Sequence, residues 1–193
     1  MRESGTMTEF DRGAGSLCLD FVATVRDWPG RHVELLATPA ELTGWFEEQG
    51  LPAAAGGLTE PDLLAARALR GAVNETTRGL IVSRPPTPED IRLINTAGRR
   101  PTPVFLLGPG GRTRTPVPEP DAAAALSVIA RDAINLLAGP DLSRVRTCDS
   151  DGCATLFLDR SPSGRRRWCS MRRCGGRAAA ANYRRRRAAR SQP

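Results

Sequence analysis

Four of the five cysteines lie in the C-terminal part of the chain, and their spacing is the feature that most limits how this region can fold. They form two pairs, Cys148-x4-Cys153 and Cys169-x4-Cys174, separated by fifteen residues. Two close pairs joined by a spacer of this length allow four thiolates from two chain segments to surround a tetrahedral Zn²⁺. A site closed by four thiolates leaves no position for a catalytic water, so the pattern predicts one structural zinc ion.

The same cysteines allow two other interpretations. Two disulfides would form if the protein were exported, but the N-terminal residues MRESGTMTEFDRG lack the apolar core of a signal peptide. The sequence also contains no run of about eighteen apolar residues that would suggest a membrane span. We therefore expect a soluble, cytoplasmic protein, in which clustered cysteines more often hold metal. A redox switch, in which oxidation releases the zinc, uses the same residues and stays open.

Positive charge is concentrated in the same region. Residues 1–143 contain 14 Arg and 18 Asp or Glu, a net charge of −4, whereas residues 144–193 contain 14 Arg and 3 Asp, a net charge of +11. The chain has no Lys, so a genome rich in G and C would explain the overall preference for Arg. That preference would act on the whole chain and does not explain the segregation. Charge of one sign on a short module favours an anionic partner.

The larger segment, residues 1–143, is predicted to be a helical domain. Thr38 and Thr87 are each followed by Pro, and Thr59 by Glu-Pro-Asp, which places an N-cap residue and a Pro at the start of three helices. Apolar runs on either side of residues 108–111 predict two short strands. Helices are expected to begin near residues 16, 39, 60, 88 and 121.

Residues 144–193 are predicted to form a small zinc module. The sequences ATLFLD and RRRWC flank the turn-forming residues 160–164, which indicates a β-hairpin between the cysteine pairs. The Ala- and Arg-rich residues 170–190 predict a helix whose first turn donates the second ligand pair. A knuckle, a hairpin and such a helix form a treble-clef-like arrangement. The expected fold class is mainly α with a small β component (α+β), with the linker near residues 141–144.

Some of the arginines are expected to serve the zinc site itself. One Zn²⁺ with four thiolates carries a formal charge of about −2, and the residues expected to offset it are Arg165, Arg166, Arg172 and Arg173. Others favour contact with nucleic acid, because a planar guanidinium pairs with phosphates and reads guanine edges. Phosphate contact alone does not separate DNA from RNA. The candidate nucleic-acid-binding residues are Arg165, Arg166, Arg167, Arg173, Arg177 and Arg184.

These C-terminal motifs resemble the CGNR zinc finger. The resemblance rests on the cysteine spacing, the strand Leu156–Asp159, the run Arg-Arg-Trp-Cys-Ser-Met at 166–171 and the sequence Cys-Gly-Gly-Arg at 174–177. In that family the finger usually follows an ABATE domain, which is associated with stress-induced transcription regulation. Residues 17–24, LCLDFVAT, are similar to the N-terminal motif of that domain.

Two positions depart from the family pattern, because Gly176 and Ala23 stand where the family has Asn. Neither supplies a metal ligand, so the predicted zinc site is unaffected, whereas Ala23 weakens the case for a polar site in the N-terminal domain. Asp20 lies within the same apolar run and needs a partner there. It would cap a neighbouring turn or, together with Thr24, line a ligand pocket.

The resemblance implies a transcription regulator. Its zinc module would bind DNA, and its N-terminal domain would sense a small-molecule effector or form a homodimer. We expect no enzymatic activity and no membrane partner. One alternative is an RNA-binding protein that uses the same basic module. The other is an enzyme with a pocket within residues 15–140, which titratable groups converging near Asp20 would support.

Overall fold

The computed structural model describes residue 10 and residues 13–28, 30–52, 56–117 and 121–190. Helices make up most of this part of the chain, together with three two-stranded antiparallel sheets, which confirms the predicted fold class. Among the described residues, no helix combines the length and the hydropathy needed to cross a lipid bilayer. In chain order the elements are α1 (Leu17–Val22), β1 (Val25–Arg26), β2 (Val33–Glu34), α2 (Pro39–Glu48), α3 (Glu60–Ile81), α4 (Pro88–Gly98), β3 (Val104–Leu107), β4 (Arg114–Val117), α5 (Ala122–Ala138), η1 (Pro140–Arg144), β5 (Val145–Thr147), β6 (Leu156–Leu158), η2 (Met171–Gly175) and α6 (Gly176–Arg190).

The predicted helix starts are confirmed, and a side chain accepts a capping hydrogen bond at the starts of α2, α4 and α5. The Thr38 hydroxyl accepts a hydrogen bond from the amide of Glu41 (3.3 Å), and the Glu41 carboxylate accepts one from the amide of Thr38 (2.8 Å). This reciprocal pair forms a capping box at the start of α2. At α5, Asp121 accepts a hydrogen bond from the amide of Ala124 (2.7 Å). Each cap satisfies an amide that the helix itself leaves unpaired, and so fixes where the helix begins.

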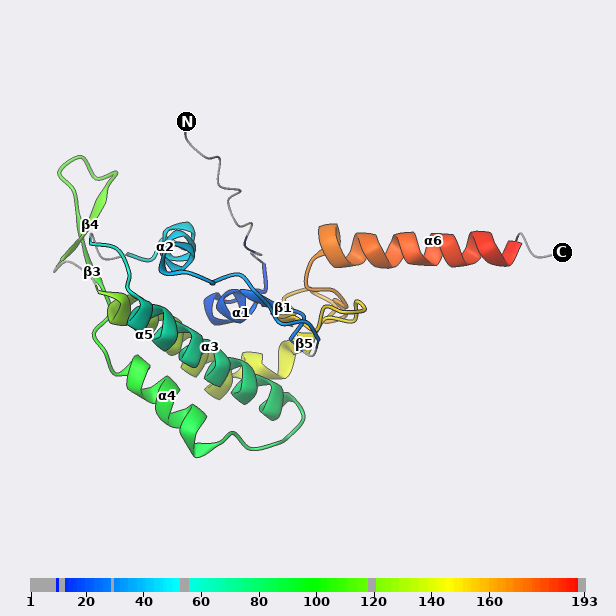
Figure 1. Ribbon diagram of the computed structural model, residues 1–193, viewed down its shortest axis with the longest axis horizontal. Helices are drawn as coiled ribbons and strands as arrows, with labels where there is room; N and C mark the ends of the chain where they lie inside the picture. Colours follow the sequence, from blue (N-terminus) through cyan, green and yellow to red (C-terminus); the bar gives the residue numbers. More distant parts are fainter. Residues whose placement is uncertain (1–9, 11–12, 29, 53–55, 118–120, 191–193) are drawn as a thin grey trace.

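The core forms where α1, α3 and α5 meet, with α4 packed against both α3 and α5. Figure 1 shows α4 running beside α3, with α2 near α1. The ring of Trp45 on α2 lies 5.0 Å from the ring of Phe21 on α1, and both side chains are fully buried. Burial of an aromatic side chain contributes about 2–3 kcal/mol, so this contact helps to hold α2 on the helical body.

The cysteine-bearing segment packs into this same core. β5 and β6 form an antiparallel pair with Val145 opposite Leu158, and all three residues of β6 are buried. Beside β6, Gly15 has a φ of +94°, and a Cβ there would lie 2.9 Å from the carbonyl oxygen of Leu158. This close approach requires glycine. One buried cluster therefore continues across the charge boundary near residues 141–144.

One predicted strand pairing is wrong. The sequence indicated a hairpin between residues 154–159 and 165–169, but the second of these segments is not a strand. β6 pairs with β5 instead. The Arg166 side chain donates hydrogen bonds to the carbonyls of Trp168 and Cys169, which satisfies these groups without a strand partner. The short pair β1–β2 has no counterpart among the predicted elements.

Two elements extend from the helical body. The predicted strands around residues 108–111 are confirmed as the β3–β4 hairpin, with Val104 opposite Val117. α6 follows the π-helical turn η2 and points away from the other helices (Figure 1). Its closest packing partner is η2. The position of α6 is therefore set by the turn that carries the last cysteine.

Candidate metal centre and basic surface

The first cysteine pair lies in the turn that joins β5 to β6. Cys148 follows β5 directly, and its amide donates a 2.9 Å hydrogen bond to the carbonyl of Thr155, at the start of the returning segment. Gly152 has a φ of +67°, a conformation that lets the chain reverse at little steric cost. The Cys153 amide closes the turn with a 3.0 Å hydrogen bond to the carbonyl of Ser150. Both sulfur atoms thus come from one tight knuckle.

The second pair lies where the chain enters η2. Cys169 precedes this turn, and Cys174 lies within it. The Ser170 hydroxyl accepts a hydrogen bond from the amide of Arg173 (3.2 Å), and the Ser170 carbonyl accepts one from the amide of Cys174 (2.9 Å). Ser170 therefore acts as the N-cap of the turn and fixes the position of the last cysteine.

The four predicted ligands converge. Their sulfur atoms all lie within 4.8 Å of one another, and all four residues are buried. Cys153 Sγ lies 3.6 Å from Cys169 Sγ and 3.5 Å from Cys174 Sγ. A Zn–S bond of about 2.3 Å gives a sulfur–sulfur separation of about 3.8 Å in a tetrahedron, whereas a disulfide needs about 2.05 Å. All of these cysteines are free thiols in the structure. The cluster is consistent with one structural zinc ion.

The pKa shifts of two of the clustered cysteines favour binding of a cation. A hydrogen bond with the Cys169 thiol lowers the pKa of Cys153, and the same hydrogen bond raises the pKa of Cys169. The cluster thus accommodates a first thiolate at Cys153, and burial and nearby negative charge oppose further deprotonation at Cys169. A divalent cation at the centre of four sulfur atoms removes this repulsion, so metal binding and loss of the remaining protons should occur together.

Two arginines stabilise the surroundings of the cluster, and Arg177 is the closer to a sulfur atom. Its Nη2 donates a hydrogen bond to Cys174 Sγ at 3.3 Å, and this bond raises the pKa of Arg177. Arg177 lies on the exposed side of α6, so it places a positive charge between the thiolates and solvent. The sequence indicated a role beside the zinc for other arginines and a nucleic-acid contact for Arg177, so this contact of Arg177 with Cys174 was not predicted.

Arg166 is the second of these arginines, and its role is structural. Its guanidinium lies over the ring of Phe157, 4.8 Å from the ring centroid. Its Nε donates to the carbonyl of Trp168 (2.8 Å), and its Nη2 donates to the carbonyls of Cys169 and Gly13. Arg166 thus joins the loop before the second cysteine pair to the N-terminal part of the chain. This role could not be predicted from the sequence, because Arg166 stands between two other arginines and nothing in the sequence distinguishes it from them.

Asp159 organises the same loop from the other side. This buried carboxylate accepts hydrogen bonds from the amide of Ser161 (2.9 Å) and from the amide of Arg166 (3.0 Å). Hydrogen bonds from Ser161, followed by the one from Arg166, lower the pKa of Asp159. The loop between the cysteine pairs is therefore closed around a carboxylate, and it presents Arg165 and Arg167 on its outer side.

The exposed loop arginines differ in their contacts. Arg165 makes no side-chain hydrogen bond or ion pair with the residues that the structure describes. Arg167 forms an ion pair with Asp149 (2.9 Å) and lies 5.4 Å from the centroid of the Trp168 ring. Because this pair is largely exposed, it is worth less than about 1 kcal/mol and can exchange for another anion.

The remaining predicted arginines lie on η2 and α6. Arg173 is half-buried in η2, whereas Arg177 and Arg184 are exposed on α6. Arg177 and Arg184 are seven residues apart, which is two helical turns, and they share one face. This face lines a cavity of about 540 Å³ between α6 and the first cysteine turn, whose other charged or aromatic walls are Asp149, Asp151, Arg167 and Trp168.

The two residues predicted as a possible ligand pocket both have roles within the fold. The Asp20 carboxylate accepts hydrogen bonds from the amides of Gly13 (3.0 Å) and Ala14 (2.8 Å), so it caps the neighbouring turn. The Thr24 hydroxyl is buried and donates to the carbonyl of Phe21 at 2.6 Å. A role for either residue in ligand binding stays a prediction.

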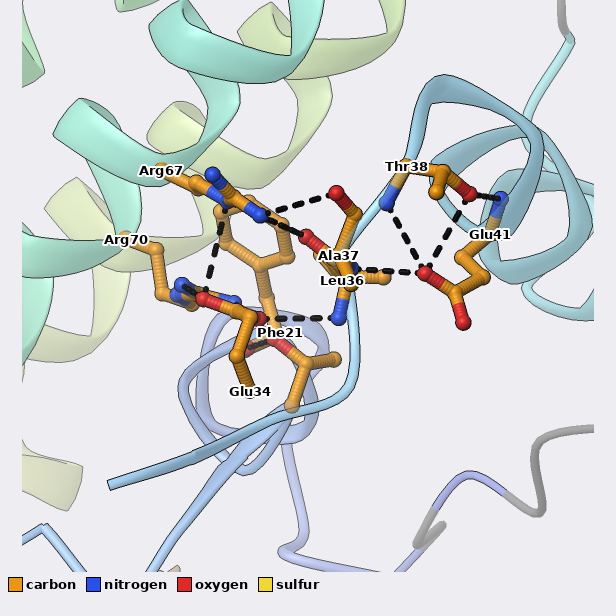
Figure 2. Close-up of polar contacts among 9 residues, drawn as sticks. Phe21, Glu34, Leu36, Ala37, Thr38, Glu41, Arg67 and Arg70 are labelled. Carbon is orange, nitrogen blue, oxygen red and sulfur yellow. Dashed lines mark hydrogen bonds and ion pairs between the residues drawn. The ribbon is translucent and has the colours of Figure 1, made fainter. Parts of the chain in front are cut away.

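Thr24 also belongs to a buried polar network that the sequence did not indicate. Figure 2 shows Arg67 and Arg70 of α3 directed at the Glu34 carboxylate. Arg70 donates to Thr24 Oγ1 (2.8 Å) and forms a two-pronged ion pair with Glu34, while Arg67 donates to the carbonyl of Leu36. Burial raises the pKa of Glu34, but the hydrogen bond and charge of Arg70 outweigh it, so that the pKa is lowered. The network fixes the segment between β2 and α2 against α3.

Comparisons with known proteins agree with these features. Residues 15–140 match the ABATE family, described as "Putative stress-induced transcription regulator". Residues 144–187 match the CGNR zinc finger, a range that contains all four clustered cysteines. No curated protein shows significant similarity to the chain. The ABATE match covers well over half of the sequence, so the chain belongs to the ABATE family and carries a CGNR zinc finger after its ABATE domain.

Proposed function

We propose that this protein is a transcription regulator that binds duplex DNA through its zinc finger, with α6 as the element that enters the major groove. The observation that carries the proposal is the placement of α6. This basic helix points away from the body while its base is fixed by the cysteine cluster (Figure 1). The zinc ion would then act as a rigid mount for a recognition helix and take no part in chemistry.

The dimensions of α6 suit this role. Fifteen residues at 1.5 Å per residue give a helix about 22 Å long. The major groove is about 12 Å wide and admits one α-helix. The helix is formed mainly by Ala and Arg, so its small side chains permit close approach while its guanidinium groups reach phosphates or guanine edges. A helix of this composition has little apolar surface to pack against its own protein.

The contacts distinguish the candidate arginines from one another, apart from Arg173, which is half-buried in η2. Arg165, Arg177 and Arg184 are exposed, and we assign them to DNA. Arg177 uses one of its five N–H groups on Cys174, which leaves the others for a phosphate. Arg166 is occupied with backbone carbonyls and is the weakest candidate. Arg167 would have to exchange Asp149 for a phosphate.

The proposal is tested by measuring binding to a 20-base-pair duplex as a function of salt. Replacing Arg165 and Arg184 together by Gln removes two phosphate contacts. We expect affinity to fall on the order of tenfold near physiological salt, and the log–log salt slope to flatten by about 1.8. The zinc content should stay at one per chain, because neither residue contacts a sulfur atom in the structure.

The matched control is the double replacement of Arg99 and Arg112 by Gln. Both residues are exposed arginines of the ABATE domain, so the two variants lose the same charge. We expect the control to bind DNA as the unchanged protein does. Equal losses in both variants would mean that overall charge attracts DNA, which contradicts a role for the finger. Tighter binding to RNA of the same length would replace DNA by RNA as the partner.

A further inference from the structure

A small apolar cleft with two arginines at its edge lies in the ABATE domain, on the helices α3, α4 and α5. It has a volume of about 220 Å³. Its apolar walls combine the side chains of leucines with those of alanines, and Leu69 and Leu126 are almost completely buried at its base. The alanines that line it are Ala65 and Ala68 of α3, Ala97 of α4 and Ala123 of α5.

The cleft exists because alanines occupy positions where the three helices meet. α3 and α4 pack closely, as do α4 and α5, so the helix backbones themselves are held in place. A methyl side chain fills less space between helices than a leucine or isoleucine would. The walls of the cleft are therefore parts of long, packed helices, and its shape does not depend on a loop.

The charged residues that line the cleft are both arginines. Arg92 and Arg100 are the titratable residues among those that line it, and neither is buried. Arg100 makes no side-chain hydrogen bond or ion pair with the described part of the chain. Arg92 contacts Glu89 one turn away at 2.5 Å, but both side chains are about two-thirds exposed. An exposed pair of this kind is weak and leaves the guanidinium available to another carboxylate.

The adjoining helix ends add little net charge to the cleft. Ala123 lies in the first turn of α5, where the Asp121 carboxylate accepts a hydrogen bond from the amide of Ala124 and so offsets the partial positive charge of this helix end. The opposite partial charge is expected at the C-terminal end of α4. There the Arg131 side chain donates hydrogen bonds to the carbonyls of Gly98 (3.0 Å) and Arg100 (3.1 Å), which offsets the partial negative charge.

We infer that this cleft binds a small amphipathic anion, whose apolar part lies on the alanines and leucines and whose carboxylate pairs with Arg92 and Arg100. The volume lies below the roughly 300 Å³ at which pockets for drug-sized ligands begin. The ligand class is therefore a monocarboxylate with a short apolar chain or a single ring. This inference goes beyond the proposed DNA binding and does not depend on it.

The test uses the full-length, zinc-loaded protein and two probes of equal length, octanoate and octan-1-ol. In an NMR titration of backbone amides, we expect octanoate to shift the signals of Ala68, Ala97 and Ala123 and to reach saturation. Octan-1-ol should bind at least tenfold more weakly, because it lacks the charge that the two arginines recognise. Equal affinity for both probes, or saturable shifts confined to another part of the protein, would overturn the inference.

Two variants test the site itself. Arg100→Gln should weaken octanoate binding by about tenfold and leave octan-1-ol binding unchanged, whereas Arg99→Gln, its matched control outside the cleft, should affect neither. Ala68→Leu should block both probes by filling the cleft at an exposed helical position, with Ala138→Leu on α5 as its control. If Ala68→Leu fails to fold, Arg100→Gln and its control still decide the question. Loss of octanoate binding in Arg99→Gln as well as Arg100→Gln would contradict the assignment.

Discussion

The amide of Leu158, on the strand between the two cysteine pairs, donates a 2.6 Å hydrogen bond to the carbonyl of Ala14, just before α1. A second bond joins the first cysteine turn to α3, where Arg78 Nη2 donates to the carbonyl of Ala154 at 2.6 Å. The zinc finger and the helical part therefore share one hydrogen bond between backbone groups and one from a side chain to the backbone, as well as a buried cluster. We therefore expect the stability of the helical part to depend on the metal.

Cys174→Ser should remove the zinc and destabilise the whole chain. A serine hydroxyl is a poor zinc ligand, and the energy of metal binding is part of the folding energy. We expect zinc to fall well below one per chain, and the melting temperature of the helical circular-dichroism signal to fall by about 10 °C. Zinc analysis and thermal unfolding measure the two effects.

Cys18→Ala is the control for this prediction. Cys18 is buried but lies outside the cluster of four, so its replacement should leave one zinc per chain. It should cost only the packing of a small side chain, about 1 kcal/mol. Full zinc content in Cys174→Ser would contradict the four-cysteine site. An unchanged melting temperature after zinc loss would instead contradict the coupling of finger and helices.

Arg166→Ala and Arg165→Ala should separate a structural arginine from an exposed neighbour. Arg166 donates to three backbone carbonyls and stacks on Phe157, so its loss should lower the free energy of unfolding by about 2–4 kcal/mol. Arg165→Ala should change it by less than about 0.5 kcal/mol. Urea unfolding of the zinc-loaded proteins measures both. Similar small losses in both variants would show that the carbonyl contacts of Arg166 do not matter for stability.

Much of the helical part could be predicted because its signals are local. Thr38, Thr87 and Asp121 each cap the helix that follows them, and such caps depend on residues only three positions away. The four cysteines could be assigned for a similar reason, since their spacing alone restricts the geometry. The strand that pairs with β6 could not be predicted, because residues 145–147 and residues 165–169 lie at similar separations from β6 in the sequence. Arg166 decides between them by satisfying the carbonyls that a strand pairing would have used.

The Glu34–Arg70 ion pair could not be predicted, because it joins two segments that are far apart in the sequence. Arg70 is on the buried face of α3, in line with Leu63, Ala66 and Val73. An arginine at an apolar position of a helix is the one signal that would have indicated a buried ion pair. Its acidic partner, Glu34, lies 36 positions earlier, in a two-residue strand. The sequence contains no pattern that identifies this carboxylate among the others.

Glu34→Gln should destabilise the protein at neutral pH, because it leaves the Arg70 guanidinium, 4% exposed, without its counter-charge. We expect a loss of about 2–4 kcal/mol at pH 7. The folded state lowers the pKa of Glu34, so its contribution is complete above the unfolded value near 4.5 and is lost as the pH falls through the lower, folded value. The difference between the variant and the unchanged protein should therefore shrink below pH 4.5.

Urea unfolding of both proteins at pH 7 and at several lower values tests this dependence. The comparison is made between metal-free samples, because protonation of the cysteines would otherwise release zinc within the same range. Glu47→Gln is the matched control, since Glu47 is exposed on α2. It should change stability by less than about 0.5 kcal/mol at every pH. A constant difference for Glu34→Gln across the whole range would rule out its ion pair as the cause.

Arg177→Gln should make the zinc easier to remove with acid. Arg177 donates to Cys174 Sγ at 3.3 Å, and its positive charge offsets the negative charge of a zinc ion bound by four thiolates. Without this charge the cluster should hold zinc less tightly, so that the midpoint of acid-induced zinc release should move upward by a fraction of a pH unit. A colorimetric chelator that reports free zinc during the titration measures the midpoint.

Arg165→Gln, which removes the same charge from an exposed position on the neighbouring loop, should leave the midpoint of zinc release unchanged. An equal shift in both variants would mean that general positive charge, and not the hydrogen bond to Cys174, protects the zinc site.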